Sequence, residues 1–314
     1  CEGCIGSVSK AKKDKKVVRM IRFLLWLMSL LPLSWLYAVG AWGGRMVYRF
    51  DRTYAQRLAE NAAQAGYDAP EFWLKNASES GRGGAELAYL WSDEVTQLLP
   101  QIKVSGWEAV EQLRAQGRGM VMLTPHMGAF ELLSLWIGQR VPFMAMYRQP
   151  KFAEAEAVML AGRERLGVQM ATADLKGVRM LLRHLKQGHV VGLLPDQVPS
   201  GQGEFVLADW FGRPAKTMTL PVKLLHQAKA GLVVMFAKRV DAPHRFELYF
   251  EVVDVPDSGD ITADVQTINA HMERLIRMAP EQYLWNYNRY KGAPEVEPEV
   301  ASQSTTQNPA EKQA

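Results

Sequence analysis

The chain has 314 residues, of which 48% are hydrophobic, and a formal net charge of +4. This length and apolar content suffice for one large domain with appendages, or for two domains. Only two cysteines are present, Cys1 and Cys4, which excludes a disulfide framework and a cysteine-rich metal site in the body of the chain.

The positive charge is concentrated at the amino-terminal end. Residues 1–22 contain seven Lys and Arg and two acidic residues, whereas residues 293–314 contain four Glu and one Lys. The remaining body is nearly balanced, which argues against nucleic-acid binding, because that function needs a basic face on the folded domain. A basic cluster beside an apolar segment points instead to an anionic membrane surface.

The first predicted element is a membrane anchor. Residues 1–19 precede Met20, a plausible protein start, and we interpret them as a basic extension that is not native or lies upstream of the true start. The uncharged run 23–43 is long enough to span a bilayer and carries the Trp and Tyr typical of a membrane interface. We expect residues 20–44 to anchor the protein, either spanning the membrane or lying in its interface. A cleaved signal peptide is the alternative, but the run is long for one and no clear cleavage motif ends it.

The next segment, residues 45–100, is predicted to be a helical lead-in. Apolar positions recur at helical spacing over 52–65 and 71–99, with breaks expected at Gly66 and at the glycine-rich stretch 81–84.

From residue 101 to residue 292, strand-like and helix-like segments alternate. This pattern predicts an α/β core with a mixed, mostly parallel sheet flanked by helices. The expected strands are 120–124, 143–147, 168–171, 189–194, 204–210, 232–239 and 246–253, and the expected helices are 129–139, 151–166, 175–187, 217–229 and 263–278. Residues 293–314 have no aromatic residue and much Pro, Glu, Gln and Ser, and we expect them to be a disordered tail.

The most informative segment is T-P-H-M-G-A-F-E at residues 124–131. It follows the apolar run 119–123, so His126 is expected at the end of a buried strand and Glu131 in the first turn of the next helix. Sites in open α/β sheets gather at this edge. A carboxylate that binds one imidazole nitrogen fixes the tautomer and leaves the other nitrogen free to accept a proton from a substrate hydroxyl. The alternative is a structural histidine in the core or at its rim, whose hydrogen bonds are made within the protein and which has no catalytic role.

Further polar residues follow other expected strands. Arg148 ends the second strand, where it could reach a phosphate or a carbonyl, and Asp196 and Gln197 end another apolar strand. Thr217 closes the stretch D-W-F-G-R-P-A-K-T before an expected helix, whose amino-terminus would attract anions. Each feature has an ordinary reading as well: a surface ion pair, a turn or a tight bend.

Together and in this order, these segments resemble the lipid A biosynthesis acyltransferases of Gram-negative bacteria, the late lauroyl and myristoyl transferases of the wider lysophospholipid acyltransferase superfamily. The resemblance extends from Met20 to Lys291. The His-x4-acid spacing belongs to the whole superfamily, whereas Glu as its last residue and the remaining segments point to the lipid A branch. The extension 1–19 and the acidic tail have no counterpart. The segments are L-L-P-L-S-W-L-Y-A-V-G, T-P-H-M-G-A-F-E, M-Y-R-Q-P, A-G-R-E-R-L-G, L-L-P-D-Q-V-P, W-F-G-R-P-A-K-T-M-T and P-E-Q-Y-L-W-N-Y-N-R-Y-K.

The resemblance implies a reaction and roles for residues. A fatty acyl thioester on acyl carrier protein would be transferred to a hydroxyl of an acylated glucosamine disaccharide, the lipid A precursor. His126 would be the general base, and Glu131 would orient it and stabilise the imidazolium. Arg148, with Arg163 as a second candidate, would bind the acidic headgroup or the oxyanion.

Asp196 lies in the family's third motif and would be structural or substrate-orienting, and Gln197 and Thr217 would also bind substrate. No metal and no cofactor is implied, because the acyl carrier protein is a co-substrate. The implied partners are that carrier, the lipid A precursor and membrane lipid, with no nucleic acid. The implied location is the bacterial inner membrane, with the catalytic domain on its cytoplasmic face.

Three alternatives stay open at this stage. The acceptor could be a lysophospholipid or another membrane lipid, although glycerolipid acyltransferases more usually carry Asp in place of Glu131. The protein could be a membrane-anchored lipid- or carrier-binding protein without chemistry, against which the His126 and Glu131 pair argues. A metal hydrolase would lose its activity to chelators.

Overall fold

The computed structural model describes residues 18–150, 152–199, 203–241 and 245–294. Most of the expected extension 1–19 and of the expected tail 293–314 therefore lies outside the described residues.

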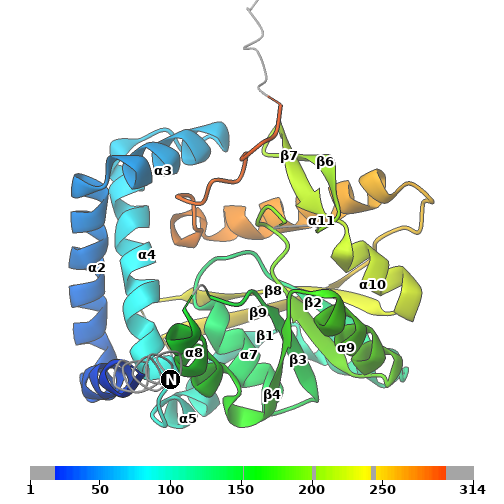
Figure 1. Ribbon diagram of the computed structural model, residues 1–314, viewed down its shortest axis with the longest axis horizontal. Coiled ribbons are helices and arrows are strands. Elements are labelled where there is room, and N and C mark those ends of the chain that lie inside the picture. Colours follow the sequence, from blue (N-terminus) through cyan, green and yellow to red (C-terminus); the bar gives the residue numbers. More distant parts are fainter. Residues whose placement is uncertain (1–17, 151, 200–202, 242–244, 295–314) are drawn as a thin grey trace, which may run out of the picture.

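A seven-stranded sheet forms the centre of the protein, in the order β1-β9-β8-β2-β5-β3-β4 (Figure 1). Every neighbouring pair is parallel except β8 and β9, which are antiparallel. The predicted mixed, mostly parallel sheet is confirmed. Its strands are β1 (Lys103–Ser105), β2 (Met120–Leu123), β3 (Phe143–Tyr147), β4 (Val168–Thr172), β5 (Val190–Leu193), β8 (Gly231–Arg239) and β9 (Phe246–Val253).

Helices cover both faces of this sheet, because the side chains of a central strand alternate between two apolar clusters. Val121 and Leu123 of β2 belong to one cluster, whereas Met120 and Met122 belong to the other. The first cluster contains residues of α9 (Leu175–Lys186), α10 (Leu220–Ala228) and α11 (Ile261–Met278), and the second contains residues of α6 (Trp107–Arg114) and α7 (Phe130–Gly138). The remaining elements of this region are α8 (Ala153–Arg163), the short helix α5 (Val95–Leu98) and the 3-10 helices η1 (Leu99–Gln101), η2 (Arg165–Gly167) and η3 (Pro280–Gln282).

A separate hairpin of β6 (Phe205–Trp210) and β7 (Arg213–Met218) rises beside α11 (Figure 1). The sequence predicts no strand over residues 213–218 and places the start of the next helix at Thr217. That prediction was wrong, because Phe211 and Gly212 both have positive φ, 50° and 76°, as a two-residue hairpin turn needs. Pro214 does not disrupt β7, because this strand is an edge.

The amino-terminal helices pack beside the sheet, with α2 (Leu33–Phe50) and α4 (Pro70–Leu90) side by side and α3 (Arg52–Gln64) across one end (Figure 1). The predicted break at residues 81–84 is wrong, because α4 runs through them. These glycines serve a close helix contact instead. A Cβ atom on Gly44 would overlap the carbonyl oxygen of Ala77, and one on Gly81 would overlap that of Gly40.

A buried ion-pair network joins this helix pair to the sheet. Arg239 of β8 is bound by Glu79 and Glu86 of α4, at 3.0 and 2.9 Å, and Tyr37 of α2 donates to Glu86 at 2.9 Å. Apolar residues of the amino-terminal helices, such as Leu36 of α2 and Leu58 of α3, also belong to the two clusters on the faces of the sheet. The helical lead-in and the sheet therefore share their cores.

The expected membrane-anchor helix is not confirmed. Among the described residues, no single helix is long and apolar enough to cross a bilayer. The helices Val18–Ser29 and Leu33–Phe50 meet the requirement only as a pair, and the chain bends by 118° between them.

Candidate active site

His126 lies just beyond the carboxyl end of β2, and Asp196 lies just beyond the end of the neighbouring parallel strand β5. Asp196 binds this histidine twice. Its Oδ1 lies 2.7 Å from the ring Nδ1 of His126, and its Oδ2 accepts the backbone N–H of the same residue at 2.9 Å. Since Nδ1 is occupied, Nε2 is the ring nitrogen left for a substrate.

The surroundings of Asp196 favour its ionised form, which is the form that holds the ring. It is 2% exposed, whereas the side chain of His126 is 20% exposed. Burial raises the pKa of Asp196, but the charge of His126 and the hydrogen bonds from its ring and backbone lower this pKa by more. The net pKa of Asp196 therefore lies below its ordinary value. An ionised Asp196 places the proton of neutral His126 on Nδ1 and leaves Nε2 as the acceptor.

The loop that carries His126 is held by backbone hydrogen bonds to a segment far along the chain. Leu284 donates to the carbonyl of His126 at 3.0 Å, and Gly128 donates to the carbonyl of Gln282 at 3.0 Å. Gly128 has a φ of +56°, and a Cβ atom there would overlap the carbonyl oxygen of Ala237. The glycine of the motif is therefore required by backbone conformation and by close approach.

The structure corrects the expected partner of His126. Glu131, in the first turn of α7, is bound by Arg163 at the end of α8: the Nε atom of Arg163 donates to both carboxylate oxygens, at 3.0 and 2.9 Å, and its Nη2 donates as well. Among the described residues, Glu131 makes no hydrogen bond to His126. A bidentate guanidinium satisfies a buried carboxylate better than an imidazole does, and Glu131 is only 7% exposed.

The other predicted substrate-binding residues differ in their surroundings. Arg148 is exposed and, within the described part of the chain, forms no hydrogen bond or ion pair. Gln197 is half-buried directly after Asp196. Both follow strands β3 and β5, so they lie at the same sheet edge as His126.

Thr217 departs from the expectation of substrate binding. It is 1% exposed, its hydroxyl accepts from Nη2 of Arg289 at 2.7 Å, and it leaves no surface for a substrate. The guanidinium of Arg289 also donates to the carbonyl of Lys216 at 2.7 Å and stacks on the ring of Trp210 at 4.8 Å. Thr217 thus positions a buried arginine between the hairpin and the carboxyl-terminal segment.

Sequence reasoning gave no role to Tyr283 or Arg289, although it noted the motif in which they lie. Tyr283 is buried next to Asp196: burial and the charge of Asp196 raise the pKa of its hydroxyl. Burial lowers the pKa of Arg289, against the opposite effects of Tyr283 and Asp196. The site therefore extends behind His126 through Asp196 to a tyrosine and an arginine of the closing motif.

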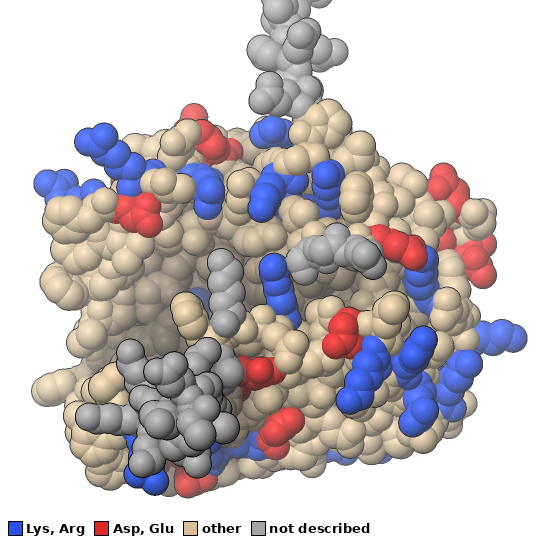
Figure 2. Space-filling model, viewed as in Figure 1, with Lys and Arg blue, Asp and Glu red and all other residues tan. Residues whose placement is uncertain are grey.

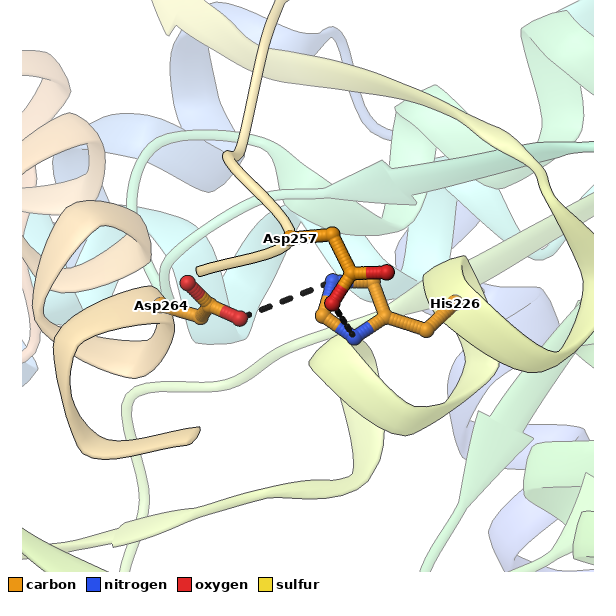
Figure 3. Close-up of side chains that lie close together, drawn as sticks. All are labelled: His226, Asp257 and Asp264. Carbon is orange, nitrogen blue, oxygen red and sulfur yellow. Dashed lines mark ion pairs between the residues drawn. The ribbon is translucent and has the colours of Figure 1, made fainter. Parts of the chain in front are cut away.

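Only one group of side chains among the described residues has the composition of a cation site: His226, Asp257 and Asp264. Figure 3 shows the two carboxylates at different nitrogens of the same ring. Asp257 lies 3.5 Å from Nδ1 and Asp264 lies 3.6 Å from Nε2. A single ion can use only one of these nitrogens, so the geometry fits an imidazole between two carboxylates better than a metal centre. The group lies near the amino end of β8, at the opposite edge of the sheet from His126.

Comparison with known proteins agrees with this architecture. The sequence model of the bacterial lipid A biosynthesis acyltransferases matches residues 14–292. The lipid A biosynthesis lauroyltransferase of Escherichia coli (strain K12) is 26% identical over 276 residues, which cover 85% of this chain and 89% of the relative. The lipid A biosynthesis myristoyltransferase of the same organism is 26% identical over 64% of this chain and 61% of the relative.

The name of a third relative indicates a different acceptor. The phosphatidylinositol mannoside acyltransferase of Mycobacterium tuberculosis (strain CDC 1551 / Oshkosh) is 23% identical over 57% of this chain and 57% of the relative. The family match covers most of the chain, including every strand of the sheet. The chain belongs to the bacterial lipid A biosynthesis acyltransferases.

Proposed function

We propose that this protein transfers a fatty acyl chain from acyl carrier protein to a hydroxyl of an acylated glucosamine disaccharide, the lipid A precursor. The observation that carries the mechanism is the pairing of His126 with a buried, ionised Asp196, which leaves Nε2 as a base. General base catalysis of this kind contributes about 10²–10⁴-fold to a rate.

The proposed reaction is an acyl transfer in two steps. The acceptor hydroxyl oxygen attacks the thioester carbonyl carbon while its proton moves to Nε2 of His126. The resulting tetrahedral intermediate collapses, the carbon–sulfur bond breaks, and the leaving thiolate receives the proton from the imidazolium. Asp196 stabilises that imidazolium in both steps.

We assign two arginines to the negative charges of the reaction, on the thioester oxygen and on the acceptor headgroup. Arg163 is fixed by Glu131, so its guanidinium is positioned rather than free. Arg148 is exposed and unpaired among the described residues, which suits a phosphate of the acceptor headgroup. In this arrangement Glu131 acts by positioning Arg163. Gln197, which directly follows Asp196, is assigned to substrate binding.

The amino-terminal helices support a membrane location. Trp35, Val39 and Trp42 of α2 are 60–64% exposed, and they lie on the side of the helix opposite to the Gly40–Gly44 contact with α4. The preceding helix adds further exposed apolar side chains, among them Phe23 and Trp26. Such a surface suits helices that lie in the membrane interface, here the inner membrane with the sheet on its cytoplasmic side. Figure 2 shows a hollow between the helices α2 and α4 and the centre of the protein, where a lipid could enter from the membrane surface.

The test is mass spectrometry of lipid A from cells that lack this protein, complemented with wild type or with His126→Ala. We expect the deletion to remove one secondary acyl chain and only wild type to restore it. His189→Ala is the matched control, because His189 precedes β5 at the opposite sheet edge. Full restoration by His126→Ala would disprove the mechanism.

The similarity to the phosphatidylinositol mannoside acyltransferase favours a second candidate, in which the acceptor is another membrane glycolipid or a lysophospholipid. The same experiment separates the two: an unchanged lipid A with a shift in another lipid class would keep the chemistry and change the acceptor.

A further inference from the structure

One face of α9 carries an unusual row of cations. Lys176, Arg179, Arg183 and Lys186 are all exposed, and their spacing of three, four and three residues places them along one side of the helix. Figure 2 shows Lys and Arg gathered on the right-hand side of the protein, over the position of α9 in Figure 1. We call these four residues the α9 stripe.

Three of the four residues of the stripe lack the ion pairs that neutralise other cations on the surface. Within the described parts of the chain, Arg179, Arg183 and Lys186 form no hydrogen bond or ion pair, whereas Lys103 and Arg274 are bound to Glu247 and Glu251. A row of uncompensated charges on one helix raises the electrostatic free energy of the free protein and is available to a partner of opposite charge.

The stripe begins at the same edge of the sheet as the candidate active site, at the edge strand β4. The helix starts at Leu175, three residues after the end of β4, and the carboxyl ends of β4, β3, β5 and β2 share one edge of the sheet with His126. Leu175 is 78% exposed and lies on the same side of α9 as the stripe. The surface therefore combines an exposed apolar side chain at the edge of the sheet that holds the site with positive charge that extends away from that edge.

The position of α9 distinguishes between the two anionic surfaces that such a row could bind. The helix α2 lies at one end of the long axis of the protein, and α9 lies in the opposite half (Figure 1). A membrane that contacts Trp35 and Trp42 would leave the α9 stripe facing the aqueous side. An acidic soluble protein fits this place and an anionic lipid surface does not.

We propose that the α9 stripe, with Leu175, is the surface on which the acidic carrier protein docks to deliver its acyl thioester. This inference rests on the proposed function, which supplies the carrier as donor. Docking there brings the carrier to the sheet edge that holds His126 while α2 stays on the membrane.

The experiment compares two charge-reversed variants of the full chain in detergent. Arg179→Glu/Arg183→Glu reverses two of the four charges of the stripe and brings its net charge to zero. Arg114→Glu/Lys229→Glu makes the same change in net charge at the amino-terminal edge of the sheet, where both residues are exposed. The probe is acyl carrier protein loaded with saturated acyl chains, with a purified lipid A precursor as acceptor, at low and at physiological ionic strength.

We expect the stripe variant to raise KM for the loaded carrier at least about tenfold at low ionic strength, with kcat within about twofold of wild type, and the control to match wild type. The gap between wild type and stripe variant should shrink as salt is added. A carrier whose acidic helix is changed to lysine should restore KM with the stripe variant.

Equal KM values for the two variants would overturn the assignment of α9. So would a stripe variant that loses binding to anionic vesicles but keeps its KM for the carrier, because the stripe would then be a membrane contact. A failure of the proposed function looks different: wild type itself would not accept the loaded carrier as a donor.

Discussion

Asp196 holds the ring and the backbone of one histidine at the same time, with Oδ1 at Nδ1 of His126 and Oδ2 at its N–H. A single carboxylate therefore fixes both the orientation of the His126 ring and its tautomer. Replacement by asparagine tests this directly, because an amide N–H that faces Nδ1 would drive the proton to Nε2 and remove the base. We expect Asp196→Asn to lower kcat by about 10²–10⁴-fold with a smaller change in KM.

The measurement is steady-state kinetics together with a thermal melt, since Asp196 is buried beside Tyr283. A folded Asp196→Asn protein with the turnover of wild type would show that the pairing is structural.

The contact of Glu131 with Arg163 makes a second prediction, which a double-mutant cycle can test. If Glu131 acts by positioning Arg163, then Glu131→Gln, Arg163→Met and the double variant should lower kcat to a similar extent, because the second change removes nothing further. Arg163→Met should also destabilise the protein by roughly 2 kcal/mol, because it leaves a buried carboxylate without its partner. Additive losses in kcat would instead support a direct role of Glu131 at His126.

The apolar side of α2 is expected to bind membranes. Serine at Trp35, Val39 and Trp42 should reduce cosedimentation with phospholipid vesicles by more than about tenfold, because burial of a large apolar side chain stabilises by roughly 1.5–3 kcal/mol. Phe205→Ser/Leu207→Ser, on the exposed side of β6, is the control. Unchanged cosedimentation would mean that another surface contacts the membrane. Deletion of residues 1–44 is a poorer test, because it removes Leu33 and Leu36 from a core cluster.

Two neighbouring glycines of α2 should respond in opposite ways. A Cβ at Gly43 meets no atom within 4 Å, whereas one at Gly44 overlaps the carbonyl of Ala77. Gly43→Ala should stabilise by up to about 1 kcal/mol through helix propensity. Gly44→Ala should destabilise by roughly 1–3 kcal/mol through overpacking. Urea unfolding measures both, and equal effects would show that α2 and α4 do not approach as closely as described.

The buried network predicts a pH dependence of stability. Burial raises the pKa of Glu86 from 4.5 to about 7, in spite of Arg239 and the Tyr37 hydroxyl, which lower it. The folded state then keeps a proton that the unfolded state has released, so this group's contribution to stability falls as pH rises from about 4.5 to about 7. Relative to Glu86→Gln, wild type should lose stability across that window, as followed by the urea midpoint at each pH. A difference that is independent of pH would contradict the raised pKa, and Glu60→Gln serves as the exposed control.

The sequence predicted the sheet well, because its central strands are short apolar runs with clear ends. Phe143–Tyr147 and Phe246–Val253 agree with the prediction to the residue. It missed β7 because Pro214 and the polar residues around it do not alternate like a strand, and it missed β1 because three residues carry no periodicity. It placed a break at residues 81–84 because helix propensity cannot register a helix from elsewhere in the chain that packs on those glycines.

The sequence predicted the residues of the site but not their partners. His126, Glu131 and Asp196 were all singled out, but their partners depend on which strand ends are neighbours in the sheet. β2 lies next to β5, which brings Asp196 to His126, whereas Glu131 on α7 meets α8 and Arg163. Pairing of carboxylates with bases across 70 residues is a property of strand order, which the sequence pattern alone does not state.

The hydrogen bonds from Leu284 and to Gln282 have a consequence for the order of events during synthesis of the protein. The ribosome releases α2 first and the segment that holds the His126 loop last. A growing chain that already contains His126 and Asp196 still lacks the backbone partners of His126 and Gly128. The apolar helices can thus settle before the site is complete, and a chain that ends before Gln282 lacks two of the backbone hydrogen bonds of the loop that carries His126.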